Sequence, residues 1–248
     1  MSVSIYSDHV IKSGDCDSMY MEFKKTTLAR QIAQDSGLFI VPKVLDYDAS
    51  HGVLVLDRIY NYVPISELIR KRVPVHNKLL KLGQCLALVH NNLVLHPCDD
   101  RSSIPKTFAG TLPHCALHGD LNVQNVGIST HASTEKLVIL DWNTSPLLST
   151  NSTYGSPFFD ICWFKVTGFS RAGISVSLNR YLLDAMQALI KGYSKESDFW
   201  GSNFWAYQRS FLREWAKLMS NQKGRMSAAR TVITAALMWK LSAYRMTS

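Results

Sequence analysis

Two short segments constrain the fold of this sequence more than any other feature. The first, LHGDLNVQNVGI, spans residues 117–128 and contains Asp120 and Asn125. The second, KLVILDWN at residues 136–143, is a run of leucine and β-branched residues that ends on Asp141. Such a run is typical of a buried strand. The order is therefore a polar loop, followed by a strand that presents a carboxylate at its end.

These polar residues suit the transfer of a phosphoryl group to a hydroxyl. That reaction needs a carboxylate near the acceptor proton and oxygen ligands that hold Mg²⁺ against the polyphosphate. Asp120 suits the first task, and Asn125 and Asp141 suit the second. Gly, Asp and Asn also collect in loops for backbone reasons, so only the combined spacing favours this chemistry.

The order His-x-Asp-Leu-x-x-x-Asn followed by strand-Asp resembles the catalytic and metal loops of the protein-kinase-like superfamily. Gly119 and Trp142 resemble the aminoglycoside phosphotransferase and choline kinase branch, because protein kinases usually carry Arg and Phe at those places. The resemblance implies an α+β, two-lobed protein-kinase-like fold, with a reduced N-terminal sheet lobe and a mostly helical C-terminal lobe. It also implies ATP as the donor, Asp120 as the base, and Asn125 and Asp141 as Mg²⁺ ligands.

The same resemblance predicts nucleotide-binding residues near the N-terminus. A kinase places a Lys on a strand to hold the phosphates and pairs it with a Glu on the next helix. Lys12, in the context Val-Ile-Lys, and Glu22 occur in this order. A solvated Lys and a Glu favoured by the helix dipole are the alternative. The segment Arg58, Ile59 and Tyr60 is similar to the hinge that binds adenine through its main chain.

Hydrophobic spacing predicts two regions of different structure. Residues 1–62 are expected to form the nucleotide-binding lobe, and residues 63–248 the helical lobe with the catalytic loops and the acceptor site. The first region contains a helix over 21–37, with Phe23, Leu28 and Ile32 on one face and Gly37 as its stop, and strands within 38–48 and 52–63. Further helices are expected from Pro64 and over 76–92, 177–193, 205–220 and 227–244.

Three residues around these motifs have supporting roles in the prediction. His90 ends the helix over 76–92 and is expected to be a structural hydrogen-bonding residue, and His118 to orient the catalytic loop. For Asp160 there are two alternatives: a simple helix N-terminal residue, or a residue that braces the catalytic loop, as the resemblance to the superfamily implies.

One departure leaves an alternative open. Only eleven residues precede Lys12, and no Gly-x-Gly occurs among them. Either the protein covers ATP with a reduced lid, or the chain is degenerate or truncated and binds nucleotide poorly. A nucleotide-binding pseudokinase that acts as an interaction module is the alternative to an enzyme. The intact base and metal residues favour the active enzyme.

The charge distribution bears on the acceptor. The chain has 27 Lys and Arg against 19 Asp and Glu, and from residue 200 onward Glu214 is the single acid among eight basic residues. Arg209, Arg213 and Lys217 share one helix face. This balance favours an anionic or neutral hydroxyl acceptor, such as a sugar, a phosphosugar or an envelope glycan of the lipopolysaccharide type. A solvated basic face is the alternative.

Other partner classes receive less support. No aromatic-basic module indicates nucleic acid binding, whereas the positive charge is compatible with peripheral contact with a membrane surface. The N-terminus lacks the apolar core of a secretory signal, and the run TVITAALMW is too short to cross a bilayer. The five cysteines show no paired spacing, which favours a reducing compartment. We therefore expect a cytoplasmic kinase that phosphorylates a small molecule, sugar or glycan.

Overall fold

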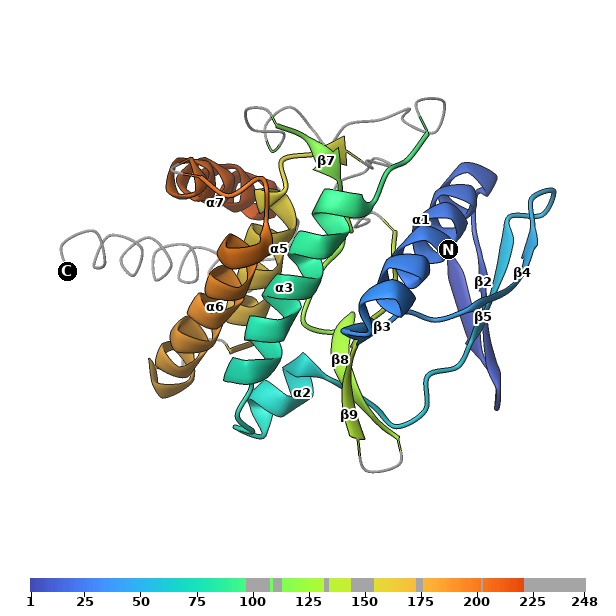
Figure 1. The fold of residues 1–248 in the computed structure, drawn as a ribbon, viewed down its shortest axis with the longest axis horizontal. Helices are drawn as coiled ribbons and strands as arrows, with labels where there is room; N and C mark the ends of the chain where they lie inside the picture. The colour runs from blue at the N-terminus through green and yellow to red at the C-terminus, as the bar shows by residue number, and fades with distance from the viewer. Residues whose placement is uncertain are drawn as a thin grey trace.

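The N-terminal part of the chain forms an antiparallel sheet covered by one helix. The computed structural model describes residues 1–96, 108, 113–131, 134–143, 154–172, 176–201 and 203–220. The strands lie in the order β1-β2-β5-β4 (Figure 1). Their bounds are Ser2–Ile5 for β1, His9–Ser13 for β2, Val44–Asp48 for β4 and Val53–Asp57 for β5. Only one strand precedes the strand that carries Lys12.

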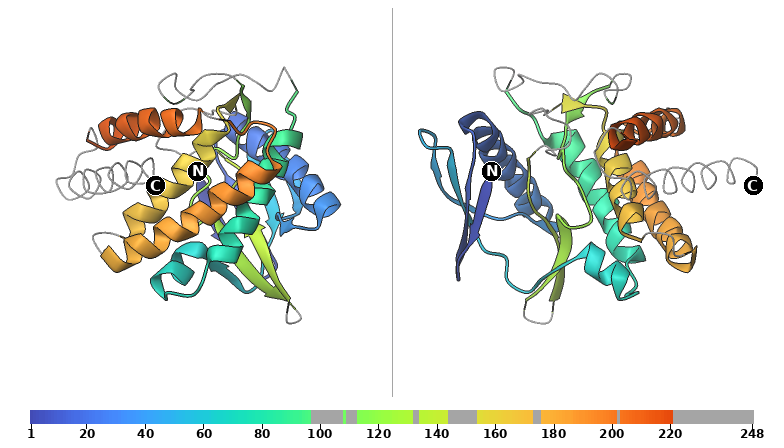
Figure 2. Two further views of the ribbon diagram at one scale, coloured as in Figure 1. Left: turned by 60° about the vertical axis from the view of Figure 1, so that its left-hand side comes forward. Right: turned by 180° about the vertical axis from the view of Figure 1, so that it is seen from behind.

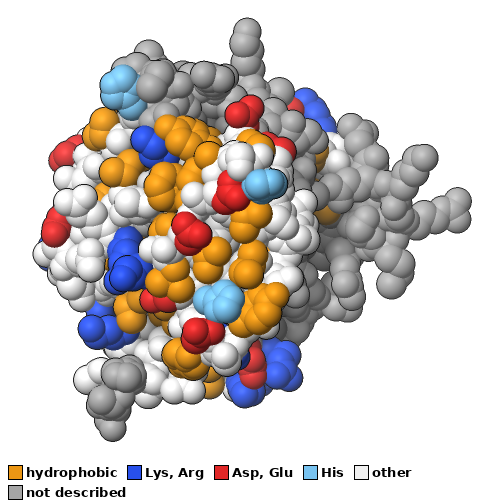
Figure 3. All heavy atoms as spheres, turned by 90° about the vertical axis from the view of Figure 1, so that its right-hand side faces the viewer, with side chains coloured by type: hydrophobic (Ala, Val, Ile, Leu, Met, Phe, Trp, Pro, Cys, Tyr) orange, Lys and Arg blue, Asp and Glu red, His pale blue; other side chains and the backbone are white. Residues whose placement is uncertain are grey.

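Helix α1, Cys16–Ser36, packs on one face of this sheet. Asp15 caps it by accepting a hydrogen bond from the amide of Ser18 at 2.9 Å, and Gly37 ends it in the left-handed conformation. Met19 meets Leu54 and Leu56 of β5 in a small apolar cluster. Figure 3 shows the opposite face of the sheet, where hydrophobic side chains are mixed with acidic and basic residues and histidines.

The buried face of α1 includes charged residues. Phe23, Leu28 and Ile32 are half-buried and pack against the apolar clusters, whereas Glu22 and Lys25 are almost fully buried. The periodicity of large apolar residues identified the helix but not the burial of Glu22 and Lys25, because these charged residues face other polar groups rather than solvent.

A second sheet joins the two regions of the chain. Its order is β3-β9-β8-β6, with β3 parallel to β9 and the other pairs antiparallel. The bounds are Phe39–Ile40 for β3, Tyr62–Pro64 for β6, Val126–His131 for β8 and Thr134–Ile139 for β9. The segment 38–48 divides into β3 and β4 around Pro42, which has no amide hydrogen to donate to a strand ladder. The boundary near residue 62 falls within β6 and stays a prediction.

Helices form the rest of the described chain, which confirms the α+β fold class. Figures 1 and 2 show α3, α5, α6 and α7 on one side of the molecule and the N-terminal sheet with α1 on the other, with β8 and β9 between them. The helices are α2 Ile65–Arg70, α3 His76–Asn92, α5 Phe158–Ala172, α6 Val176–Glu196 and α7 Phe204–Ser220, and a short ladder pairs β7 Cys115–Ala116 with β10 Tyr154–Gly155. The expected helix over 227–244 lies outside the described residues.

Helices α3 and α6 cross at very close range. A Cβ atom added to Gly83 would lie 2.1 Å from the carbonyl oxygen of Leu189, and one added to Gly192 would lie 2.0 Å from that of Leu80. Only glycine allows the two backbones to approach this closely. No helix among the described residues is long and apolar enough to span a membrane.

Candidate active site

The loop after β7 carries Asp120 and is held by hydrogen bonds to helix α5. Asp160, in the first turn of α5, accepts hydrogen bonds from the amides of His118 at 2.7 Å and Gly119 at 3.0 Å. Gly119 has a φ of 89°, a left-handed conformation that suits glycine. Burial alone would raise the pKa of Asp160, but hydrogen bonds from His90 and Gly119 outweigh it and lower the pKa. Asp160 is therefore a buried carboxylate that shapes the loop.

The surroundings of His118 show that its imidazole is neutral. The amide of Asp120 donates to its Nδ1 at 3.3 Å, so Nδ1 carries no proton, and Nε2 lies 3.0 Å from the carbonyl of Leu140. Burial lowers the pKa of His118 to about 4. The ring thus links the catalytic loop to the end of β9, which agrees with its predicted orienting role.

Both carboxylate oxygens of Asp120 accept hydrogen bonds. The indole nitrogen of Trp163 donates to Oδ1 at 2.9 Å. The side-chain amides of Asn122 and Asn125 donate to Oδ2 at 3.0 and 3.3 Å. Three donors thus hold this side chain in one orientation while it stays partly accessible.

Asp141 lies beside the catalytic loop, next to Asn125. The Asn125 amide nitrogen is 3.4 Å from Oδ2 of Asp141, so the two predicted metal residues are adjacent. Asp141 has a φ of 61°, in the left-handed region. A residue other than glycine adopts it at a cost in free energy, and such strain gathers at functional sites.

Lys12 and Glu22 form the ion pair that the sequence order predicts. The Lys12 ammonium on β2 contacts Oε1 of Glu22 on α1 and lies 2.5 Å from Oδ1 of Asp141. Burial alone would lower the pKa of Lys12, but the charges of Glu22 and Asp141 outweigh it and raise the pKa. The ammonium therefore stays charged at neutral pH. Asn143 donates to Oε2 of Glu22 at 3.4 Å and extends this network.

Lys25 joins α1 to the loop that carries Asp120 and was not among the predicted site residues. Its ammonium donates to the carbonyl of His118 at 2.6 Å, and the residue is 1% exposed. Burial lowers the pKa of Lys25 to about 8, against the attraction of Asp160 and Glu22. Its only sequence signal is its place three residues after Glu22, which puts both on one face of the helix.

The predicted hinge lies between β5 and β6 and contacts the β1–β2 turn. The Arg58 amide donates to the carbonyl of Asp8 at 3.0 Å, and the carbonyl of Tyr60 accepts from the hydroxyl of Ser129 at 2.7 Å. The Tyr60 hydroxyl donates to the carbonyl of Ser7 at 2.9 Å. The main-chain groups from the Arg58 carbonyl to the Tyr60 amide lie between these two contacts.

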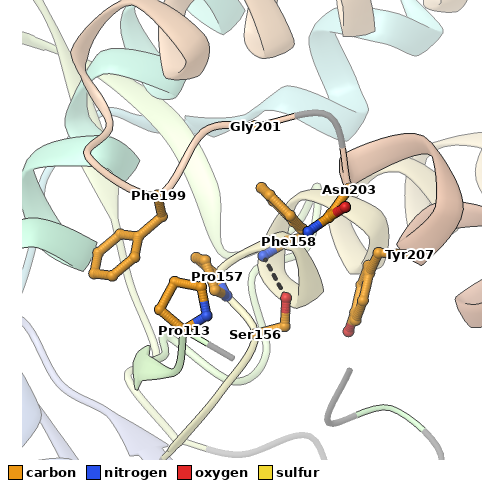
Figure 4. Close-up of a pocket in the computed structure, with 8 residues that line it drawn as sticks. All are labelled: Pro113, Ser156, Pro157, Phe158, Phe199, Gly201, Asn203 and Tyr207. Atoms are coloured by element: carbon orange, nitrogen blue, oxygen red, sulfur yellow. Dashed lines mark hydrogen bonds between the residues drawn. The ribbon is translucent and has the colours of Figure 1, made fainter. Parts of the chain in front are cut away.

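A small pocket lies elsewhere, at the start of α5. It has a volume of about 50 Å³ and contains none of the predicted site residues. Figure 4 shows its lining, in which the Phe158 amide donates to the hydroxyl of Ser156 at 3.4 Å. The Asp120 site is therefore distinct from this pocket. The structure brings Asp120, Asn125, Asp141, Lys12 and Glu22 into one hydrogen-bonded network, and the hinge stands apart from it.

Comparison with known proteins supports the fold. Scans against protein-family models and curated proteins gave no match. Several solved structures are similar. A glucosamine kinase bound to glucosamine, ADP and phosphate has a TM-score of 0.64 at 11% identity, with 98% of this chain and 78% of that one covered. A choline/ethanolamine kinase family protein from Mesorhizobium loti has a TM-score of 0.58 at 17% identity, with 95% and 84% covered.

The third structure, a microcompartment-associated aminopropanol kinase, has a TM-score of 0.58 at 12% identity, with 99% of this chain and 92% of that one covered. At sequence identities this low, structural similarity shows a shared fold and not a shared activity. The resemblance predicted from the motifs is thus confirmed in three dimensions. This chain has the fold of the protein-kinase-like superfamily, in the form found in these small-molecule kinases.

Proposed function

We propose that this protein is a Mg²⁺- and ATP-dependent kinase that phosphorylates a hydroxyl group of a small molecule. The observation that carries the proposal is the convergence of Asp120, Asn125, Asp141 and the Lys12–Glu22 pair, which come from separate segments of the chain. These residue types supply a base, metal ligands and a phosphate-binding cation.

Asp120 is the proposed general base. As the acceptor oxygen forms a bond to the γ-phosphorus, the bond from that phosphorus to the bridging oxygen of ADP breaks. The hydroxyl proton passes to the carboxylate of Asp120, and ADP leaves with the bridging oxygen. The hydrogen bonds from Trp163, Asn122 and Asn125 hold the carboxylate in place for this transfer.

Asp141 and Asn125 would hold Mg²⁺. One carboxylate and one amide oxygen from the protein suit Mg²⁺, which takes its other ligands from phosphates and water. Their adjacency and the left-handed backbone of Asp141 fit this role. When bound, the ion neutralises charge that develops on the phosphate oxygens.

Lys12 would bind the α- and β-phosphates of ATP, with Glu22 orienting it. Because its pKa is raised, its charge is available at physiological pH. In the hinge, the Arg58 amide and the Tyr60 carbonyl already contact protein groups. The adenine would therefore bind the main chain between them, around Ile59.

The acceptor class rests on two different arguments. The similar structures are a glucosamine kinase, an aminopropanol kinase and a choline/ethanolamine kinase family protein, which favours a hydroxyl compound that bears an amine. The basic residues of α7 favour an anionic sugar or glycan instead. Arg213 and Lys217 are exposed, and Lys217 pairs with Glu214 at 2.8 Å. Lys223, Arg225 and Arg230 lie outside the described residues.

Phosphate transfer from labelled ATP tests the proposal. The panel should hold choline, ethanolamine, aminopropanol, glucosamine, an aminoglycoside, a phosphosugar and a lipopolysaccharide core glycan, each with and without Mg²⁺. We expect Mg²⁺-dependent transfer to at least one of them. In Asp120→Asn, turnover should fall by roughly 10²-fold or more while ATP binding persists.

Asp35→Asn is the matched control, because Asp35 is an exposed carboxylate near the end of α1. Equal turnover in Asp120→Asn and the wild type would exclude Asp120 as the base. Nucleotide binding without transfer to any acceptor would favour the pseudokinase.

We place this activity in the cytoplasm, where ATP and reduced thiols coexist. The cysteines within the described ranges, Cys16, Cys85, Cys115 and Cys162, are free thiols. Burial raises the pKa of Cys85 and of Cys162 to about 12. These two cysteines therefore belong to the core and take no part in the proposed chemistry.

A further inference from the structure

Helix α5 contacts the catalytic loop through two side chains one turn apart. Asp160 holds the backbone amides of His118 and Gly119. Trp163, three residues later, donates its indole N–H to Oδ1 of Asp120 at 2.9 Å. Residues at this spacing share one face of a helix. The same face of α5 therefore contacts both the backbone of the loop and the carboxylate of Asp120.

Trp163 is well suited to hold a carboxylate without exchanging protons with it. An indole N–H donates a hydrogen bond but accepts none, so it cannot compete with Asp120 for the acceptor proton. Hydrogen bonds to an ionised oxygen are about twice as strong as neutral ones. The bond thus favours the ionised, proton-accepting form of Asp120.

The indole itself is firmly held. Trp163 is 1% exposed, and its ring stacks on Phe159 with the ring centres 5.6 Å apart and the planes 18° from parallel. A ring packed on a neighbour in this way has few alternative rotamers. The position of its N–H is therefore fixed by the packing of the helical lobe. The hydrogen bond in turn fixes the position of the Asp120 carboxylate.

The two oxygens of Asp120 consequently face different surroundings. Oδ1 accepts one hydrogen bond, from the buried indole of α5, whereas Oδ2 accepts two, from Asn122 and Asn125. In the proposed function, the phosphates lie on the Asp141 side. The indole bond therefore fixes the orientation of the carboxylate relative to the phosphates.

We infer that Trp163 is a positioning residue whose indole N–H anchors Oδ1 of Asp120 and so fixes the orientation in which this carboxylate meets the acceptor hydroxyl. The inference rests on the proposed function for its chemical meaning. The anchoring contact itself can be tested without turnover.

The first test uses the indole resonance of Trp163 in the ¹⁵N-labelled full chain, without nucleotide. The sequence holds six tryptophans, and loss of one indole signal in Trp163→Phe identifies the residue. In Asp120→Ala, we expect the Trp163 signal to move upfield further than any other indole signal, because its charged acceptor is gone. If Trp163→Phe does not fold, through-bond assignment of the wild type supplies the same signal. An unmoved signal in folded Asp120→Ala overturns the inference.

The second test uses kinetics with whichever panel acceptor the wild type phosphorylates. Trp163→Phe keeps an aromatic ring but removes the donor, so kcat should fall roughly tenfold to a hundredfold, the range for a hydrogen bond to a charged group. The KM for ATP should stay within about twofold, since no contact to the nucleotide site is removed. Phe164→Leu, fully buried in the same helix, controls for lost packing and should retain most of its kcat.

A double mutant separates positioning from general damage. If Trp163 acts through Asp120, adding Trp163→Phe to Asp120→Asn should cause little further loss of kcat. An equal loss in both backgrounds, or an unchanged kcat in Trp163→Phe, overturns the inference. A wild type that transfers no phosphate, yet shows the indole shift, counts against the proposed function and supports the anchoring contact.

Discussion

At the scale of single residues, the site depends on charged groups placed where water is scarce. Lys12, Glu22 and Lys25 are nearly or fully buried, and each has an opposite charge or a carbonyl as its partner. Removing one member of such a group leaves the others uncompensated, which costs more than the lost contact alone. The strained backbone of Asp141 is part of this charged group, because its φ of 61° keeps its carboxylate between Lys12 and Asn125.

Replacing Asp141 with Ala should weaken nucleotide binding itself. The proposed metal would lose its charged ligand, so affinity for Mg-ATP should fall by about tenfold or more, the scale seen when a metal's ligand environment is disturbed. Calorimetry with and without Mg²⁺ measures the change. Asp35→Ala, at an exposed position, should bind as the wild type does. Equal Mg-ATP affinity in Asp141→Ala would remove Asp141 from the metal site.

At the scale of elements, α5 is the helix on which the catalytic loop and α7 both depend. One side of it holds the loop through Asp160 and Trp163. Lys165 contacts α7 through a hydrogen bond to Gln208 and lies 6.0 Å from the ring centre of Phe204. Burial lowers the pKa of Lys165 to about 8. The helix packing therefore contains a lysine that is disfavoured in its charged form.

The stability of the α5–α7 packing should consequently depend on pH. The pKa of Lys165 is about 8 in the folded chain, below roughly 10.4 for an unfolded lysine. Between these values the unfolded chain binds more protons, so this lysine's contribution to stability rises with pH. The difference in unfolding free energy between Lys165→Met and the wild type should therefore favour the variant more at pH 7 than at pH 10. The change in this difference should be up to about 3 kcal/mol.

Urea unfolding of both proteins at pH 7 and pH 10 measures this difference. Taking the difference between variant and wild type cancels the other titrating groups. Lys191→Met, at an exposed position of α6, should show a difference that is independent of pH. The same flat result for Lys165→Met would mean that this lysine titrates normally in the folded protein.

At the scale of the whole molecule, the site is assembled by contacts between distant segments. Lys12 comes from β2, Glu22 and Lys25 from α1, Asp120 from the loop after β7, and Asp141 from the end of β9. Behind them, His90 of α3 lies 2.9 Å from the hydroxyl of Tyr193 in α6 and 3.1 Å from Asp160. The packing of α3 against α6 thus supports the residue that holds the catalytic loop.

Gly83→Ala should therefore damage both stability and activity. The added methyl group would collide with the carbonyl of Leu189, and overpacking of this kind typically costs about 1–3 kcal/mol. Thermal unfolding measures the loss, and turnover should fall with it as the His90 contact shifts. Gly201→Ala meets no atom within 4 Å and serves as the control. Unchanged melting of Gly83→Ala would show that the helices can separate without cost.

The sequence by itself determined the class of fold. Asp120, Asn125 and Asp141 were predicted as site residues because the loop and the strand end that carry them lie close together in the chain, and their roles stay a prediction. Alternating and helical spacing predicted α1, α3, α6 and α7, since local hydrophobic periodicity follows directly from backbone geometry. The pairing of Lys12 with Glu22 was predicted from order alone, and the structure shows the ion pair.

Only the tertiary structure decided which other residues reach the site. Trp163 and Lys25 each lie three residues from a predicted residue on the same helix, but spacing says which side chains share a face and not what that face meets. Burial of Glu22 and Lys25 in place of Phe23 on α1 was likewise hidden, because charged residues are normally read as solvent-facing. These contacts join segments far apart in the chain, so they form only when the complete fold brings those segments together.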